Sequence, residues 1–175
     1  AFAARTERIA DIRRFLHEAG FGQATRRRIQ GDASTRSYER LMLDDAPYIL
    51  MNSPKRPDGP PVRDGKPYSQ IAHLAEDVTP FIAMAKGLRL LGLSAPAIYA
   101  ADRDAGLLVL EDLGNELVVE GDPPAPIEAR YEVAADLLAV LHRERTHDTI
   151  SIDAGVQHHV PHYDMDAMLI ETELL

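Results

Sequence analysis

Apolar residues recur every three to four positions in several stretches of the chain, which is the spacing of an amphipathic helix. Residues 6–19 form the first stretch, and Gly20 follows it as a stop signal. A second helix is expected from Thr79, which can cap it, with Pro80 at its first position. Its expected apolar face consists of Phe81, Met84, Ala85, Leu88 and Leu91.

Short runs of apolar and β-branched residues predict strands between these two helices and after the second one. Five strands are expected, at residues 24–30, 36–43, 48–52, 96–101 and 107–111. Residues 53–69 contain five prolines and two glycines, which predicts a long loop that is flexible or binds a ligand. After a second Pro-rich segment, helices are expected from Ile127 to Leu141 and from Asp164 onward.

This order of elements predicts an α+β fold in which an antiparallel five-stranded sheet with one helix is joined by a hinge to a helical region. Such an arrangement places a cleft between the two parts, where small ligands usually bind. We expect an N-terminal helix in residues 1–22, a sheet lobe at 23–113 with its hinge at 110–114, and the beginning of a helical lobe at 115–175.

Composition narrows the class of protein. The net charge is -9, yet residues 1–40 hold nine arginines against five acidic residues, so the remainder is strongly acidic. A surface of that charge repels nucleic acid, and the run Arg26–Arg28 is read as a solvated strand face. The absence of cysteine excludes disulfides and thiolate chemistry, and no apolar run reaches the ~20 residues that cross a bilayer. We therefore expect a cytoplasmic protein without membrane partners.

The chain begins with Ala1 and ends at Leu175 inside an expected helix, so we expect it to be a piece of a longer protein.

A turn of small and polar residues, Gly31 to Thr35, leads directly into the second expected strand. Short side chains let backbone N–H groups approach an anion closely, so this turn is a candidate phosphate cradle. An ordinary hairpin turn has the same composition, and that alternative stays open on this segment alone.

Three segments in order resemble the aminoglycoside phosphotransferase and choline kinase family, which has a protein-kinase-like fold. They are the turn and strand 31–38, the segment Leu107–Gly114 and the helix Ala134–His142. Within that family the chain is most similar to bacterial kinases that phosphorylate the anomeric hydroxyl of N-acetylmuramate and N-acetylglucosamine. The resemblance covers about the first half of such a kinase. Some relatives are fused behind a small P-loop ATPase domain.

The resemblance implies an ATP site. Gly31, Asp32 and Ser34 would cover the phosphates, with Arg36 or Arg40 as a cation. In the hinge, Leu110 would lie at the back of the adenine pocket, while the carbonyl of Glu111 and the N–H of Leu113 would hydrogen-bond the adenine edge. The implied cofactors are ATP and Mg²⁺.

The chain departs from the family in the residues that act on phosphate. The third expected strand, 48–52, has no lysine, and the following helix offers Lys86 but no glutamate. Lys55 could substitute, although an exposed loop lysine is the simpler interpretation. The catalytic His-x-Asp-x-x-x-x-Asn loop is missing, since His162-Tyr163-Asp164 is followed by Leu169 at the asparagine position. Asp164 is better interpreted as a helix cap.

Two other groups of polar residues give weaker evidence for a functional site. His158, His159 and His162 cluster in sequence without the spacing of a metal site and are read as surface loop residues. Glu171 and Glu173 lie two positions apart, so at most one could reach a sugar hydroxyl.

The sequence thus predicts part of an ATP-dependent kinase for a small molecule, most plausibly an amino sugar, with no catalytic or metal-binding residue among these 175. Two alternatives remain: an aminoglycoside or amino alcohol as acceptor, and a non-catalytic pseudokinase or regulatory module.

Overall fold

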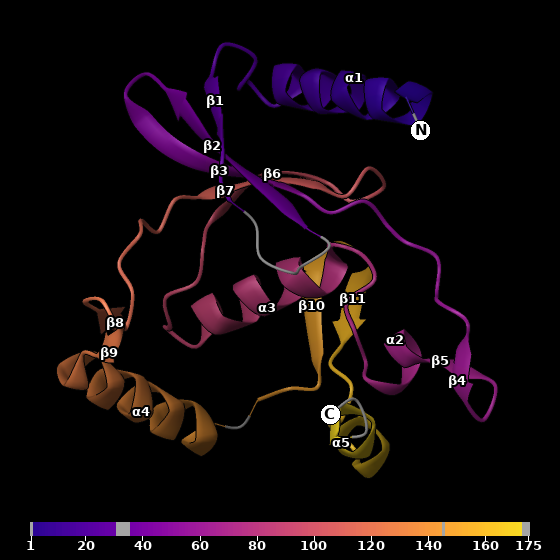
Figure 1. The fold of residues 1–175 in the computed structure, drawn as a ribbon, viewed down its shortest axis with the longest axis vertical. Coiled ribbons are helices and arrows are strands. Elements are labelled where there is room, and N and C mark those ends of the chain that lie inside the picture. Colours follow the sequence, from indigo (N-terminus) through magenta and orange to yellow (C-terminus); the bar gives the residue numbers. More distant parts are fainter. Residues whose placement is uncertain (1, 31–35, 145, 173–175) are drawn as a thin grey trace.

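A computed structural model describes residues 2–30, 36–144 and 146–172, and it has the α+β architecture that the sequence predicts. Figure 1 shows the elements in chain order. The longer elements are α1 (Phe2–Glu18), β1 (Thr25–Arg28), β2 (Ser37–Leu43), β3 (Ala46–Asn52), α3 (Thr79–Leu90), β6 (Ile98–Asp102), β7 (Leu107–Glu111), α4 (Glu128–Arg143), β10 (Thr149–Asp153), β11 (Val156–His159) and α5 (Met165–Thr172).

The five expected strands form one sheet in the order β1-β2-β3-β7-β6. Every neighbouring pair is antiparallel, and the register places Ser37 opposite Asn52, Asn52 opposite Leu107, and Tyr48 opposite Glu111. The prediction of a five-stranded antiparallel sheet is therefore confirmed. β7 lies between β3 and β6, so its backbone is paired on both edges.

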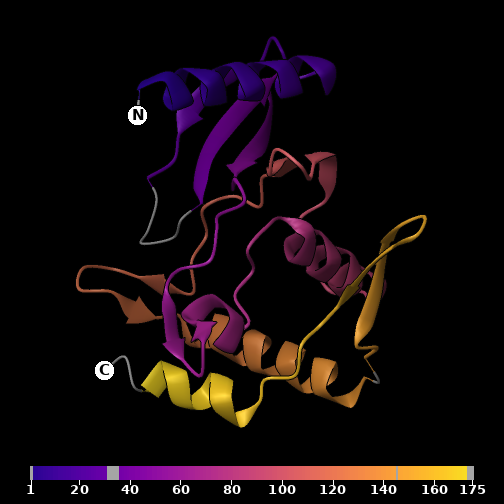
Figure 2. The same cartoon turned by 90° about the vertical axis from the view of Figure 1, so that its right-hand side faces the viewer.

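The sheet is covered on both faces, which explains the unbroken apolar run of β7. Alternate residues of a strand point to opposite faces. Leu107 and Val109 belong to a core with Leu50 and the α1 residues Phe15 and Leu16. Their neighbours point to the other face, into a second core that consists of Met51, Val78, Ile82, Ala83, Leu108, Leu110 and Ile152. Figure 2 shows α1 on one side of the sheet and the remaining helices on the other.

The helix α3 begins where the sequence predicts, but its cap and buried face differ. Thr79 is the first residue of the helix rather than its cap, and the Oδ1 of Asp77, two residues earlier, accepts the Thr79 N–H at 2.7 Å. Ile82, Ala83 and Ala85 are the buried residues of the helix, whereas Met84 is exposed. The expected face is right for Ala85 and for Phe81, which packs against the second core, but it misses Ile82 and Ala83, because the sheet and a later hairpin both contact the helix.

The Pro-rich segment 53–69 is more ordered than the loop that the sequence predicts. It contains the short strands β4 (Pro61–Arg63) and β5 (Lys66–Pro67), which pair with each other, and it leads into the helix α2 (Tyr68–Ile71). Asp64 and Gly65 lie between the strands with positive φ, as a tight turn requires.

The hairpin β10–β11 is absent from the sequence prediction and packs against α3. Ile152 is buried in the second core, and Lys86 of α3 donates to its carbonyl oxygen. Gly87 lies under the hairpin, because a Cβ there would come within 2.9 Å of Ile150. Residues that follow the hinge by almost forty positions thus complete the core beneath the sheet.

The C-terminal helices agree with the predicted positions. α4 has no buried residue, and it follows the small strand pair β8 (Val119–Glu120) and β9 (Ala125–Pro126). Asp164 caps α5, since its Oδ1 accepts the Ala167 N–H at 2.9 Å, which confirms the predicted role. In the part of the chain that the structure describes, no helix combines the length and apolar character that crossing a membrane requires.

We predict that Leu50→Ala destabilises the protein by about 2–5 kcal/mol, because it removes a fully buried side chain from the centre of the sheet. Leu90→Ala makes the same chemical change at a position that is 83% exposed, and it should cost less than about 0.5 kcal/mol. Urea unfolding followed by circular dichroism measures both values. Equal losses for the two variants would contradict the core that we describe.

Candidate functional site

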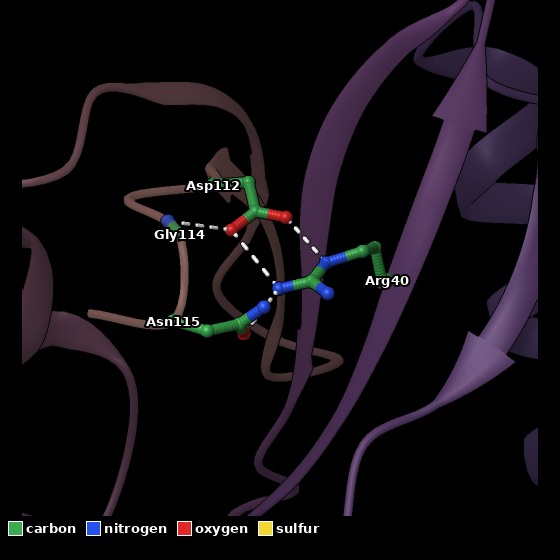
Figure 3. Close-up of polar contacts among 4 residues, drawn as sticks. All are labelled: Arg40, Asp112, Gly114 and Asn115. Carbon is green, nitrogen blue, oxygen red and sulfur yellow. Dashed lines mark hydrogen bonds and ion pairs between the residues drawn. The ribbon is translucent and has the colours of Figure 1, made fainter. Parts of the chain in front are cut away.

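The candidate site is the end of β7 and the segment that follows it. Glu111 is the last residue of the strand, and Asp112 to Asn115 lead away from the sheet. Figure 3 shows that this segment meets the side chain of Arg40, which comes from β2 on the far side of β3. The hinge that the sequence predicts is therefore held by a strand two positions across the sheet.

Arg40 donates to two hinge side chains. Its Nε lies 2.5 Å from Asp112 Oδ2, its Nη2 lies 3.3 Å from Asp112 Oδ1, and the same Nη2 lies 2.8 Å from Asn115 Oδ1. The Asp112 side chain retains only 5% of its exposure. A guanidinium that contacts both oxygens of a nearly buried carboxylate fixes orientation as well as charge. We call Arg40, Asp112 and Asn115 the hinge clamp.

The clamp also sets the backbone of the hinge. Asp112 Oδ1 accepts the N–H of Gly114 at 2.9 Å, which closes a side-chain-to-backbone turn around Leu113. Gly114 has φ +86, a conformation that an L side chain adopts only under strain. Leu113 lies at the tip of this turn with its side chain 59% exposed. Among the described residues, no hydrogen bond engages the Leu113 N–H.

The Glu111 side chain is directed away from the hinge. Its Oε2 accepts the N–H of Ala97 at 2.9 Å and lies 3.8 Å from Arg89 Nη1, while its own N–H donates to the carbonyl of Ala97. These contacts hold the end of β7 against the start of β6. Glu111 therefore uses its carboxylate for structure, and any ligand contact would come from its backbone.

Electrostatics reinforce the clamp. Burial acts to raise the pKa of Asp112, but the hydrogen bonds from Arg40 and from the Gly114 N–H, together with the Arg40 charge, outweigh it and lower the pKa below its usual value. The carboxylate is thus charged throughout the neutral range.

Of the sequence-predicted site residues, Gly31, Asp32 and Ser34 lie outside the described residues. Arg36 directly precedes β2 and is half-buried. Since Ser37 is level with Leu107 and Glu111 is four residues further along β7, the two ends of the candidate site are offset by about 13 Å along the strands. Arg36 and Glu111 therefore lie at opposite ends of the sheet.

Leu110 is buried in the second core, between the sheet and α3. This places it directly behind the hinge, and the prediction that it backs an adenine pocket remains a prediction.

Two of the four candidate cations bind partners within the protein. Arg40 was expected as a possible phosphate ligand, but it is engaged by Asp112 and Asn115 instead. Lys86 binds the Ile152 carbonyl and lies 3.5 Å from Asp153, so it serves the hairpin. Neither pairing is visible in sequence, because each joins residues more than sixty positions apart.

A cavity of about 890 Å³ lies at the opposite end of the sheet from the hinge. α1 contributes Phe15 to its wall, and the turn after β6 contributes Arg103. Lys55, Asp77 and Thr79 line it as well. Lys55, another candidate cation, therefore faces this cavity rather than the hinge.

Histidine does not form a metal site here. His158 and His159 lie on β11 rather than in the expected loop, so they point to opposite faces of the hairpin. Within residues 2–30, 36–144 and 146–172, no three His, Asp or Glu side chains are grouped as metal ligands.

We predict that Arg40→Gln lowers the free energy of unfolding by about 1–3 kcal/mol, because it leaves the nearly buried Asp112 without its cation. Arg26→Gln is the matched control: Arg26 pairs with Glu39 on the same sheet, but both side chains are 28% exposed, and its loss should be below about 1 kcal/mol. Chemical unfolding compares them. A larger loss for Arg26→Gln would show that the clamp does not anchor the hinge.

The clamp also predicts a pH dependence. Because the folded-state pKa of Asp112 is below its unfolded value of about 3.8, its contribution is present above that pH and is lost as the pH falls through the folded pKa. The stability difference between wild type and Arg40→Gln should therefore be constant from pH 7 to about 5 and shrink in more acidic solution. Unfolding curves across this range test it, and a difference that grows with acid would contradict it.

Comparison with known proteins shows which proteins the chain is similar to. The chain matches no protein-family model. It is 40% identical over 163 residues to the N-acetylmuramate/N-acetylglucosamine kinase of Caulobacter vibrioides, a match that covers 86% of this chain and 44% of that protein. It is 30% identical over 107 residues to the kinase of the same name from Pseudomonas aeruginosa, covering 61% of this chain and 26% of that protein.

The chain thus spans less than half the length of these relatives. The expected resemblance is confirmed: the chain is homologous to bacterial N-acetylmuramate/N-acetylglucosamine kinases.

Proposed function

We propose that the chain is the nucleotide-binding part of an ATP-dependent phosphotransferase with a protein-kinase-like fold, whose acceptor is a hydroxyl of an amino sugar. The homology to two amino-sugar kinases carries this proposal. The sheet order β1-β2-β3-β7-β6, with α3 inserted after the third strand, supports the kinase-like fold.

In this proposal residues 1–22 are an N-terminal helix, residues 23–113 are the nucleotide lobe, and residues 115–175 begin the acceptor lobe, with the hinge at 110–114. The adenine edge binds the hinge backbone: the Glu111 carbonyl accepts one hydrogen bond and the Leu113 N–H donates another. Two observations support this assignment. The Glu111 carboxylate is occupied elsewhere, and the turn that carries Leu113 is held by the hinge clamp.

Bound ATP supplies the γ-phosphoryl group. The residues of this chain position it rather than react with it: the hinge fixes the adenine, Leu110 supplies an apolar wall, and Arg36 offers positive charge at the other end of β2. Catalysis of phosphoryl transfer depends largely on such positioning and on charge neutralisation. In this proposal, the nucleotide lobe contributes to catalysis by holding both ends of the nucleotide against one rigid sheet.

Among the described residues, no three His, Asp or Glu side chains are grouped as metal ligands, and Mg²⁺ that binds with ATP takes most of its ligands from phosphate and water. We assign no Mg²⁺ ligand here. The base that accepts the acceptor proton is not assigned either, because the 175 residues lack the His-x-Asp-x-x-x-x-Asn loop.

A second function, a non-catalytic pseudokinase, is favoured by one observation. β3 carries no lysine, and Lys86 of the next helix is engaged by the hairpin. The nucleotide would then bind without phosphoryl transfer.

We predict that the full-length protein carrying this chain transfers phosphate from ATP to N-acetylglucosamine or N-acetylmuramate. An assay of ADP release with these sugars, an aminoglycoside, choline and homoserine measures the acceptor. Activity with an amino alcohol or an aminoglycoside alone would contradict the sugar assignment. Nucleotide binding without turnover on any acceptor would favour the pseudokinase.

The hinge contact has its own test in the same protein. Leu113→Pro removes the backbone N–H and should raise the KM for ATP roughly three- to tenfold, the value of one hydrogen bond. Leu113→Ala keeps the N–H and should leave this KM nearly unchanged. If both variants resemble the wild type, the Leu113 N–H does not bind the nucleotide.

A further inference from the structure

The helix α2 and the helix α5 come from distant parts of the chain and touch each other. α2 ends the Pro-rich segment between β3 and α3, whereas α5 follows the hairpin β10–β11. Figure 1 shows both below the sheet, and the contact lies apart from the hinge clamp. Their meeting has no part in the nucleotide contacts proposed above.

Two polar contacts tie these helices. The Tyr68 hydroxyl donates to Glu171 Oε1 at 2.5 Å across 103 positions of sequence. His73 Nε2 lies 3.4 Å from Asp164 Oδ2 across 91 positions. Asp164 is the residue that caps α5, so His73 contacts the first turn of that helix while Tyr68 contacts its last turn.

Between these polar contacts the two helices bury apolar side chains. Ile71 of α2 is 7% exposed, and Ala167 and Ile170 of α5 are buried to a similar degree. None of the three belongs to either core of the sheet. The contact is therefore separate from both cores of the sheet, with buried apolar side chains on each helix and a polar contact at each end of α5.

We propose that this interface is a clasp that positions α5, and with it the acceptor lobe, against the nucleotide lobe. Tyr68 and His73 are positioning residues in this proposal, which rests on the proposed function. The hinge is more than fifty residues from α5, and the hairpin β10–β11, which packs on α3, ends five residues before α5 without holding that helix itself. The clasp attaches it directly to a segment that leaves the sheet at the end of β3, so the distance between the lobes is set at a second place.

The chemistry of the clasp suits reversible positioning better than permanent attachment. A phenol hydroxyl bonded to a carboxylate is a charge-assisted hydrogen bond, and it also raises the pKa of Tyr68, so the hydroxyl keeps its proton at neutral pH. Both partners are solvent-accessible, which keeps the contact weaker than a buried one. An interface of this strength holds one arrangement of the lobes without preventing their separation.

The test uses the full-length protein with spin labels on cysteines placed at Arg27 of β1 and Met168 of α5. Both positions are exposed and this chain has no native cysteine, so only cysteines elsewhere in the full-length protein need to be replaced by serine first. Tyr68→Phe removes only the hydroxyl, so the distance distribution between the labels should broaden. The kcat for N-acetylglucosamine should fall about five- to tenfold, with the KM for ATP unchanged.

Three further variants test whether the effect of Tyr68→Phe comes from loss of the α2–α5 contact or from general destabilisation of the protein. Tyr131→Phe makes the same change on the half-exposed face of α4 and should alter neither measurement. Glu171→Gln keeps an acceptor oxygen for Tyr68 and should retain most of the activity, whereas Glu171→Ala should match Tyr68→Phe. An unchanged distance distribution and kcat in Tyr68→Phe and Glu171→Ala would overturn the clasp.

The label distances do not require activity. If no variant and no wild-type protein phosphorylates a sugar, but Tyr68→Phe still broadens the distribution, the proposed function fails and the clasp stands. If the wild-type protein phosphorylates a sugar, but the label distances in Tyr68→Phe and Glu171→Ala stay as in the wild type, the clasp fails and the proposed function stands.

Discussion

The packing of β7 is the constraint on which the rest of this structure depends. The strand is paired on both edges and covered on both faces, by α1 on one side and by α3 with the hairpin on the other. Because both edges and both faces of the strand make contacts, the position of its last residue, Glu111, is fixed. The hinge inherits its position from this packing, and Arg40 then fixes its direction through Asp112. The proposed adenine contacts are backbone groups, so they depend on a backbone that this packing holds in place.

The five strands and the main helices follow from local patterns that the sequence states directly, such as the apolar run of β7 and the Gly stop after α1. Where prediction failed, contacts between distant residues decided the outcome. Ile82 and Ala83 are buried because α3 packs against both the sheet and a hairpin, whereas the expected Met84 is exposed. The hairpin itself left a signal that was passed over: Ile150 and Ile152 alternate before a turn that contains Gly155.

The candidate site shows the same division. The segment Leu107–Gly114 could be recognised because its motif is continuous in sequence, whereas the clamp could not, because Arg40 and Asp112 are 72 residues apart. Arginine and lysine side chains were candidates for phosphate contacts on residue type alone. The structure shows that two of them, Arg40 and Lys86, bind partners within the protein, so residue type alone does not identify a phosphate ligand.

The hairpin β10–β11 has a consequence for how the chain acquires its shape during synthesis. Ile152 belongs to the core under the sheet, although it is encoded after the hinge and after α4. When the last strand of the sheet has left the ribosome, the lower apolar face still lacks part of its cover, and it waits for about forty further residues to emerge. The five-stranded sheet therefore does not complete its core as an independent early unit, and its folding is tied to translation of the segment that follows it.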